Sequence, residues 1–358
     1  MNEPAGCPPT PSAPPPPGDR AASPPDPADI LEAEFVGQPS EESWDLPSRS
    51  QPVARPRRRA LPLFLFGLTC LSVFWAGVWR WSPAGTFEFL IGTFLGTPEL
   101  GEDWGLRLRR LILHNGADAG IYMVALLGIL LTHEMGHFLM SLRYRVPASW
   151  PFFLPLPISP IGTLGAVIGM DGRQADRRQI FDIGLAGPLA GLAVAVPVLW
   201  MGVSQLDLTI APSGPYAIDL PLALRWIVAA RQPAGTDFQG TLAHSQLNSW
   251  FMAGWVGLLV TGLNMLPVSQ LDGGHVIYGL FGRRSRWLAR AFLATAIIFI
   301  IWTRLYSWSL MLVLILLIGP DHPPTRDDTV PLGWFRTLVG WLSLAIPILC
   351  FPPRVFAD

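Results

Sequence analysis

Charged residues are scarce in this chain of 358 residues, and that scarcity limits what the protein can be. Asp, Glu, Lys and Arg make up 14% of the sequence, and half of all residues are hydrophobic. A typical soluble domain carries about 25% charged residues. Fifteen of the 51 charged side chains fall within the first 60 residues, so the remainder is poorer still. Too few charges remain to cover a water-soluble surface, which favours a polytopic membrane protein over an ordinary soluble enzyme.

Lysine is absent and cysteine is rare. The 25 basic side chains, all Arg, nearly balance 26 acidic ones, which leaves a net charge of −1 and no basic surface for a nucleic-acid partner. The three cysteines, Cys7, Cys70 and Cys350, lie far apart and form no Cys-x-x-Cys pair. This spacing supports neither a disulfide framework nor a thiolate metal site.

The first 59 residues lack apolar periodicity and contain 15 of the 37 prolines. Such a segment cannot bury enough surface to offset the entropy cost of ordering, so we expect residues 1–59 to be a disordered Pro-rich tail. The segment also lacks the short basic start and early apolar run of a signal peptide. Partner binding by its prolines is the weaker alternative.

Long apolar runs dominate the rest of the chain. Arg55 and Arg57–Arg59 precede an apolar run at 60–79 that is long enough to span a bilayer, and the positive-inside rule then places the tail in the cytoplasm. The segment 87–95 is too short to span and is expected to be re-entrant or interfacial. We expect further spans at about 118–140, 180–203, 247–267, 287–304, 306–319 and 333–351. The predicted fold is an all-α, multi-pass membrane protein with about six to eight transmembrane helices.

The second apolar run contains the pattern His133-Glu134-x-x-His137. On a helix the two histidines are one turn apart, so their imidazoles project from one face and can share a metal ion. Glu134 lies beside them, where it can take a proton from water. Three ionisable groups are costly inside an apolar span, which favours a functional role. The alternative is a polar contact between helices of the bundle.

A hydrolytic zinc site needs a third protein ligand and an open position for water. Asp272 is the better candidate, because it ends a charge-free run from Phe251 to Gln270 and precedes two glycines that let the backbone turn tightly. His275 is an alternative that ranks below Asp272. The other histidines fall in expected loops, where we predict them to be solvated: His114, His244 and His322.

These motifs resemble the site-2 protease family of intramembrane zinc metalloproteases, of the bacterial type without a PDZ domain. The resemblance rests on His133-Glu134-x-x-His137 and on Asn264-x-x-Pro-x-x-x-Leu-Asp272-Gly, and it covers about residues 118–280. It implies that His133, His137 and Asp272 bind one zinc ion per chain and that Glu134 is the general base. Asn264 would help to position the substrate or the transition state, although an interhelical hydrogen bond is an equal alternative for this residue alone.

Two further features belong to the predicted core. Gly187 and Gly191 form a small-x-x-x-small face, which favours close helix packing over a catalytic role. Residues 151–170 are apolar but contain four prolines, which forbid a regular helix and suit an extended, membrane-associated β-hairpin. This hairpin could bind substrate or simply be a packed loop.

The resulting hypothesis is a zinc metalloendopeptidase that cuts transmembrane segments of other proteins near the cytoplasmic side, in a bacterial inner membrane with the N-terminus in the cytoplasm. The predicted parts are the tail (1–59), a first helix with a short segment (60–117), the catalytic core (118–280) and the C-terminal helices (281–358). The alternatives are a non-catalytic scaffold with a structural metal site, which would not need Glu134, and a metal-ion transporter, which would need polar residues in the last spans. A different class of zinc protease would need a downstream Glu ligand, and no Glu follows Glu134.

Overall fold

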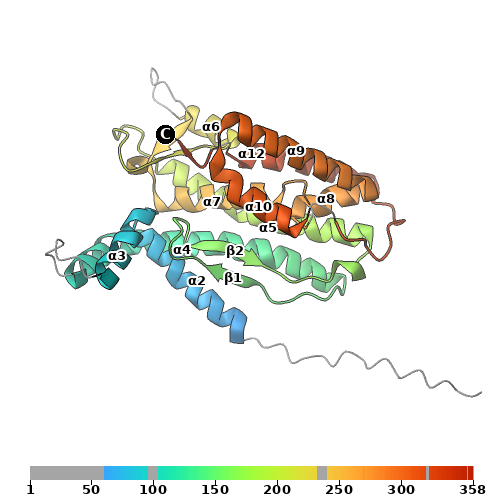
Figure 1. The fold of residues 1–358 in the computed structure, drawn as a ribbon, viewed down its shortest axis with the longest axis horizontal. Helices are drawn as coiled ribbons and strands as arrows, with labels where there is room; N and C mark the ends of the chain where they lie inside the picture. Colours follow the sequence, from blue (N-terminus) through green and yellow to red (C-terminus); the bar gives the residue numbers. More distant parts are fainter. Residues whose placement is uncertain are drawn as a thin grey trace, which may run out of the picture. The chain divides into compact units, whose positions relative to one another are not determined.

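The computed structural model describes residues 60–95, 104–231, 240–268, 270–319, 322–352 and 354–357. They belong to one unit that extends from Arg58 to Asp358, and they are mostly helical (Figure 1). The predicted Pro-rich tail at 1–59 lies outside the described residues.

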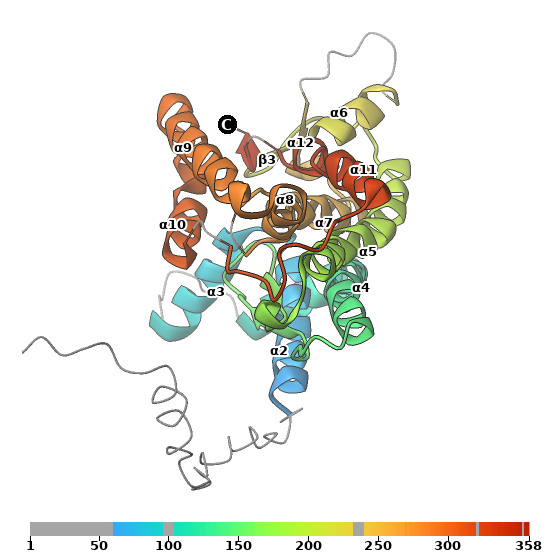
Figure 2. The ribbon, with the colours of Figure 1, turned by 90° about the vertical axis from the view of Figure 1, so that its right-hand side faces the viewer.

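Three helices form the centre of this unit: α4 (Trp104–Arg143), α5 (Arg177–Ser204) and α7 (Ser249–Asn264). Each of them packs against the other two (Figure 2). The start of α5 is fixed by a capping box, in which the Asp176 carboxylate accepts a hydrogen bond from the Gln179 N–H and the Gln179 side chain accepts one from the Asp176 N–H. Helix α7 is buried along most of its length, so it forms the interior of the bundle.

Helix α2 (Ala60–Val78) packs on α4, and α3 (Pro83–Leu95) follows it. The approach of α2 to α4 depends on a small residue, because a Cβ at Gly77 would lie 2.7 Å from the Cα of Ala119. The segment expected to be re-entrant or interfacial, 87–95, is helical and forms the second part of α3.

An antiparallel hairpin of β1 (Phe152–Pro155) and β2 (Thr163–Val167) lies against α2. Its register shifts between Phe153 and Pro155, a strand position where proline offers no N–H. Gly162 at the turn has φ +86° and approaches Val73 of α2, and Ser72 Oγ donates a hydrogen bond to the Gly162 carbonyl oxygen at 2.6 Å. The hairpin predicted within residues 151–170 is therefore present.

The described residues of the C-terminal part form five helices, and α9 and α10 lie together at one side of the bundle (Figure 2). Their bounds are α8 (Asp272–Phe281), α9 (Ser285–Thr303), α10 (Ser309–Ile318), α11 (Trp334–Ser343) and α12 (Ile346–Cys350). Short 3-10 turns lie at Gly172–Gln174, His244–Gln246, Gly282–Arg284 and Tyr306–Trp308.

A second sheet, which the sequence did not predict, has the strand order β4-β3-β5 and is antiparallel throughout. Its strands are β3 (Ala217–Asp219), β4 (Thr241–Ala243) and β5 (Phe356–Ala357), and α6 (Leu222–Ala229) follows β3. The strands are two or three residues long, too short to leave an alternating pattern in the sequence.

Among the described residues, four helical stretches are long and apolar enough to cross a membrane: Ala60–Val78, Gly105–Arg143, Arg177–Ser204 and Asp272–Thr303. The expected number of six to eight spans is not confirmed. The expected span at 247–267 is the 16-residue helix α7, and those at 306–319 and 333–351 correspond to the shorter helices α10, α11 and α12.

Candidate metal centre and its pocket

His133 and His137 lie on successive turns of α4 and face the same side. Their Nε2 atoms are 3.2 Å apart, and His133 is only 3% exposed. Two imidazoles held this close inside an apolar bundle agree with the shared-metal arrangement expected from their spacing of four residues.

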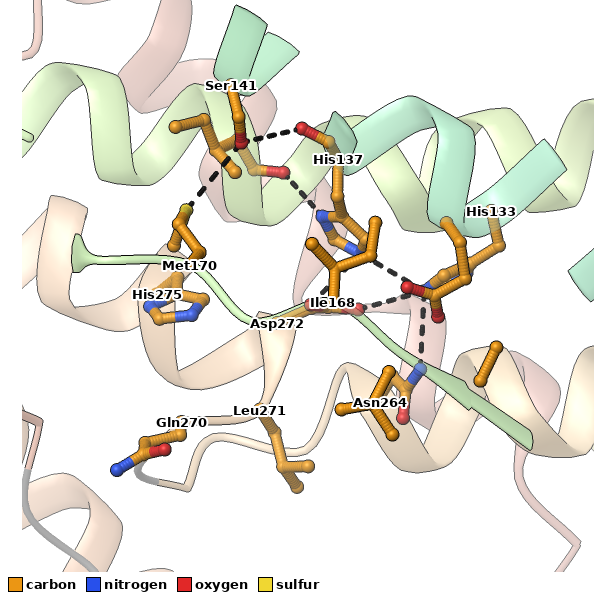
Figure 3. Close-up of a pocket in the computed structure, with 14 residues that line it drawn as sticks. His133, His137, Ser141, Ile168, Met170, Asn264, Gln270, Leu271, Asp272 and His275 are labelled. Atoms are coloured by element: carbon orange, nitrogen blue, oxygen red, sulfur yellow. Dashed lines mark hydrogen bonds and ion pairs between the residues drawn. The ribbon is translucent and has the colours of Figure 1, made fainter. Parts of the chain in front are cut away.

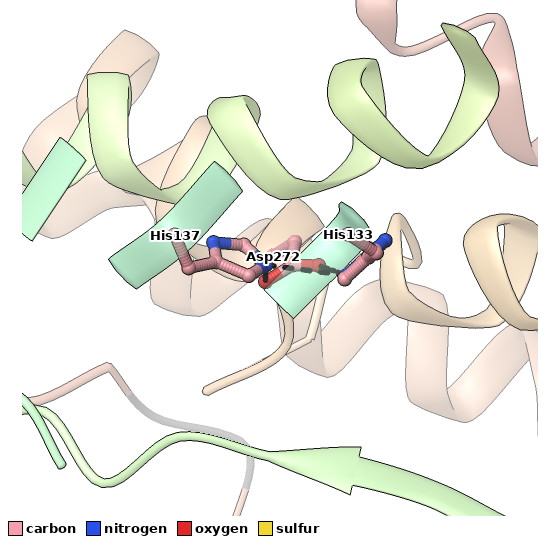
Figure 4. Close-up of side chains that lie close together, drawn as sticks. All are labelled: His133, His137 and Asp272. Atoms are coloured by element: carbon pink, nitrogen blue, oxygen red, sulfur yellow. Dashed lines mark hydrogen bonds and ion pairs between the residues drawn. The ribbon is translucent and has the colours of Figure 1, made fainter. Parts of the chain in front are cut away.

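Asp272 is the first residue of α8, and its carboxylate reaches both histidines (Figure 4). Oδ2 is 3.2 Å from the Nε2 of His133, and Oδ1 is 3.2 Å from the Nε2 of His137. The turn between α7 and α8 makes this possible, and it requires glycine at 273, because a Cβ there would lie 2.1 Å from the Met265 carbonyl oxygen. The structure thus brings together two motifs that are 139 residues apart.

The two imidazoles and one carboxylate fit a zinc ion. In tetrahedral coordination with bonds of about 2.0–2.1 Å, neighbouring ligand atoms are about 3.3 Å apart. The two Nε2 atoms are 3.2 Å apart, and each lies 3.2 Å from one of the two Asp272 oxygens. His137 Nδ1 lies 2.8 Å from the Ile183 carbonyl oxygen, which can only accept, so Nδ1 carries the proton and Nε2 presents its lone pair. Three chain ligands leave the fourth position open.

The space for this cluster comes from glycines of α5. The imidazole of His137 covers Gly187, where a Cβ would lie 2.0 Å from Nε2, and His133 covers Gly191, where a Cβ would lie 3.1 Å from Nδ1. The small-x-x-x-small pair therefore does bring two helices close together, as predicted. What it accommodates, however, is the pair of candidate ligands, which the sequence pattern alone did not indicate.

The cluster opens into a cavity of about 180 Å³ (Figure 3). Glu134 lines the cavity and is 7% exposed, and no described residue offers its carboxylate a hydrogen bond. The Asn264 amide nitrogen lies 3.2 Å from the Nε2 of His133, so this residue also belongs to the site. The end of β2 at residues 166–167, together with Ile168 and Met170 after it, lines another part of the cavity.

His275 also lines the cavity but does not join the metal cluster. Its Nδ1 lies 2.7 Å from the Nε2 of His322. We expected three other histidines to be solvated in loops. This is wrong for His244 and His322, which are partly buried. His114 is exposed, as expected, but it lies in a helix and not in a loop. His244 Nε2 lies 2.9 Å from the Arg80 carbonyl oxygen, and burial lowers the pKa of this imidazole.

Comparisons with known proteins agree with this geometry. A family model described as peptidase family M50 matches residues 121–303. The chain is 32% identical to the "Probable zinc metalloprotease EGY1, chloroplastic" of Arabidopsis thaliana, over 68% of this chain and 44% of that protein. It is 26% identical to the corresponding EGY2 of the same plant, over 78% of this chain and 50% of that protein. The chain spans about half the length of these curated relatives.

Proposed function

The chain belongs to peptidase family M50, a family of zinc metalloproteases, and we propose that it cleaves transmembrane segments of other membrane proteins, near the cytoplasmic side of the bilayer. The observation that carries this proposal is the convergence of His133, His137 and Asp272 within a bundle of apolar helices, with the unpaired carboxylate of Glu134 in the same cavity.

In this proposal His133, His137 and Asp272 hold one zinc ion per chain. The ion would supply Lewis-acid activation of a water molecule and of the scissile carbonyl group. The hydrogen bond from His137 Nδ1 to Ile183 orients one imidazole toward the ion and fixes its tautomer. The carboxylate of Asp272 adds the negative charge that a divalent cation in an apolar bundle needs.

Glu134 is the proposed general base. It follows His133 directly on α4 and lines the cavity, and no described residue competes for its oxygens. Its carboxylate would accept a proton from the attacking water and pass that proton to the leaving nitrogen of the cleaved peptide bond. A carboxylate without a partner costs free energy in a buried site, and a role in proton transfer accounts for that cost.

Asn264 is the proposed substrate-positioning residue. Its amide nitrogen lies 3.2 Å from the Nε2 atom of His133, the atom that would hold the zinc ion. With Nε2 engaged by zinc, the Asn264 amide would be free to face the cavity. There it could donate a hydrogen bond to the substrate or to the oxygen that becomes negative in the transition state.

The hairpin is the proposed docking edge for the substrate. A peptide bond inside a helix has its carbonyl hydrogen-bonded and its backbone covered by side chains, so the substrate must become extended before it is cut. Extended backbone in an apolar setting needs new hydrogen-bond partners. Strand β2 pairs only with β1 among the described strands, and residues 166–168 line the cavity. The other edge of β2 could therefore pair with the substrate by β-augmentation.

Two other functions are less well supported. A scaffold with a structural metal site would have no use for the unpaired carboxylate of Glu134. A metal-ion transporter would need polar side chains along a path through the membrane, yet α10 is apolar after Ser309 and α9 is apolar beyond Arg290 except for Thr295 and Thr303. Both threonines donate to the backbone of their own helix, so neither offers such a path.

We further infer the placement of the chain. It would be a multi-pass protein of the bacterial inner membrane with a cytoplasmic N-terminus, as the arginines before α2 favour. Residues 118–280 would form the catalytic core, between the 60–117 and 281–358 segments. Helix α7 and the apolar stretch Trp334–Cys350 are the candidates for spans beyond the four long ones. The segment 205–248 holds only α6, two short strands and one 3-10 turn among its described residues, which favours a type without a PDZ domain.

The proposal is tested by removing and restoring the metal. Purified protein in lipid vesicles is depleted of zinc with a chelator, and cleavage of a co-reconstituted single-span membrane protein is followed. We expect cleavage to stop on depletion and to return with about one zinc ion per chain. Cleavage that continues after complete zinc removal would refute the assignment.

A further inference from the structure

The segment at residues 322–332, between α10 and α11, is fixed to the start of α5 and to the second half of α8. The Arg326 N–H donates to the Ala175 carbonyl oxygen at 2.9 Å, and the Arg177 N–H donates to the Asp327 carbonyl oxygen at 3.1 Å. The Tyr278 hydroxyl donates to Asp328 at 2.7 Å. This segment lies beyond residue 303, where the family match ends, but it contacts His275, which lines the cavity of the metal centre.

His322 is the residue of this segment that contacts His275, a residue of the cavity lining. Its ring stacks on Tyr278 with the centroids 4.2 Å apart, and its Nε2 lies 2.7 Å from the Nδ1 of His275. Its own Nδ1 lies 2.5 Å from the Pro323 carbonyl oxygen. His275 can sit this close to α5 because residue 184 is glycine, where a Cβ would lie 2.5 Å from the Cβ of His275.

These contacts set the direction of each hydrogen bond. A carbonyl oxygen only accepts, so the Nδ1 of His322 must carry a proton and donate it to Pro323. Burial lowers the pKa of His322, which favours the neutral ring, and its Nε2 is then an acceptor. The Nδ1 of His275 must therefore donate to it. In a neutral His275 this leaves Nε2 without a proton, and no described residue donates to that atom.

We propose that His322 is a positioning residue that fixes the ring and tautomer of His275, so that the bare Nε2 of His275 accepts a hydrogen bond from a backbone N–H of the substrate. This inference rests on the proposed protease function. An extended substrate has N–H groups along both of its edges, and only one edge can pair with β2. His275 lines the same cavity as residues 166–168, so it can serve an N–H that β2 leaves unpaired.

The test compares two substitutions of His322 with a matched control. His322→Leu removes the acceptor, whereas His322→Gln retains one in its side-chain oxygen. Thr325→Ala removes a hydrogen bond of 2.6 Å to Asp328 within the same segment but leaves the histidine pair intact. The first readout is nitrogen-15 NMR of histidine-labelled, zinc-loaded full-length protein, with the His275 signals assigned from their loss in His275→Leu.

We expect His275 to be protonated at Nδ1 in the parent, in His322→Gln and in Thr325→Ala, and to lose this single tautomer in His322→Leu. In the cleavage assay we expect the KM of His322→Leu to rise about 3- to 10-fold, the effect of one neutral hydrogen bond, with kcat and zinc content unchanged. His275→Leu should raise KM equally, and the double variant should raise it no further, because both residues act through one contact.

A single Nδ1-protonated tautomer that persists in His322→Leu would overturn the positioning role. An unchanged KM in His275→Leu, or fully additive effects in the double variant, would overturn the substrate contact. If the parent protein cleaves nothing, the proposed function fails and the substrate contact fails with it, whereas the NMR comparison still decides whether His322 sets the tautomer of His275.

Discussion

The imidazole of His137 lies directly against Gly187 of the neighbouring helix, where a Cβ would be 2.0 Å from the Nε2 atom proposed to bind zinc. The metal centre therefore depends on a residue that is not a ligand. Helix α5 contributes no side chain to the metal cluster, but its missing Cβ atoms make room for both histidines.

Gly187→Ala should consequently abolish zinc binding. Alanine has the higher helix propensity, by about 1 kcal/mol, so the substitution would stabilise α5 if packing were not affected. We expect instead that the methyl group displaces His137 and that zinc falls from about one ion per chain to nearly none. Gly120→Ala on α4 is the control, because nothing lies within 4 Å of a Cβ there. Equal zinc content in the two variants would contradict this account.

Asp272 and His275 are the two candidates for the third zinc ligand, and substituting each one separates their roles. Asp272→Ala removes the group that faces both histidines, so zinc should be lost. His275→Ala should retain zinc, because His275 pairs with His322 instead. Metal analysis of the two purified proteins gives the answer. Retention in Asp272→Ala together with loss in His275→Ala would reverse the ligand assignment.

Much of the site could be predicted from the sequence, because its signals are local. The spacing of His133 and His137 follows from the helical repeat, and Asp272 is conspicuous as the first carboxylate after a long uncharged run. Asn264 and the hairpin were also indicated by short patterns. Their roles as ligands, base and positioning group stay predictions until they are measured.

Contacts between distant segments left no such signal. His275 and His322 are 47 residues apart in segments with no shared pattern, and burial of both rings depends on how residues 322–332 fold back. The second sheet pairs β3 with strands near residues 242 and 356 through two or three residues each. Helix α4 begins at Trp104, well before the expected span at about 118. Hydropathy could not indicate this earlier start, because the first turns of the helix are polar.

Asn264→Ala should reduce turnover without loss of zinc. If its amide stabilises the transition state, kcat should fall about 10- to 100-fold, as is typical for loss of one donor. Thr261→Val is the control one turn earlier, because the Thr261 hydroxyl bonds only to Gly257 of its own helix. A purely structural Asn264 would instead lower the midpoint of thermal unfolding and leave the kcat of the folded protein unchanged.

A proline scan across residues 161–170 tests the docking edge. Each proline removes one backbone N–H, so substitutions at positions that pair with substrate should slow cleavage while zinc stays bound. Ile158→Pro is the control, since this turn residue donates none of the hydrogen bonds within the hairpin. Substrates with a helix-breaking residue near the cut site should also be cleaved faster. Parental rates in every zinc-loaded variant would show that the hairpin is only a packed loop.

The most direct test of the central claim is the activity of zinc-loaded Glu134→Gln. Glutamine keeps the size and hydrogen bonding of the side chain but cannot take up a proton, so we expect a folded protein with about one zinc ion per chain. Its cleavage of a transmembrane substrate in vesicles should be slower by roughly 100- to 10,000-fold, the usual range for loss of a general base. Near-parental cleavage by this zinc-loaded variant would contradict the account.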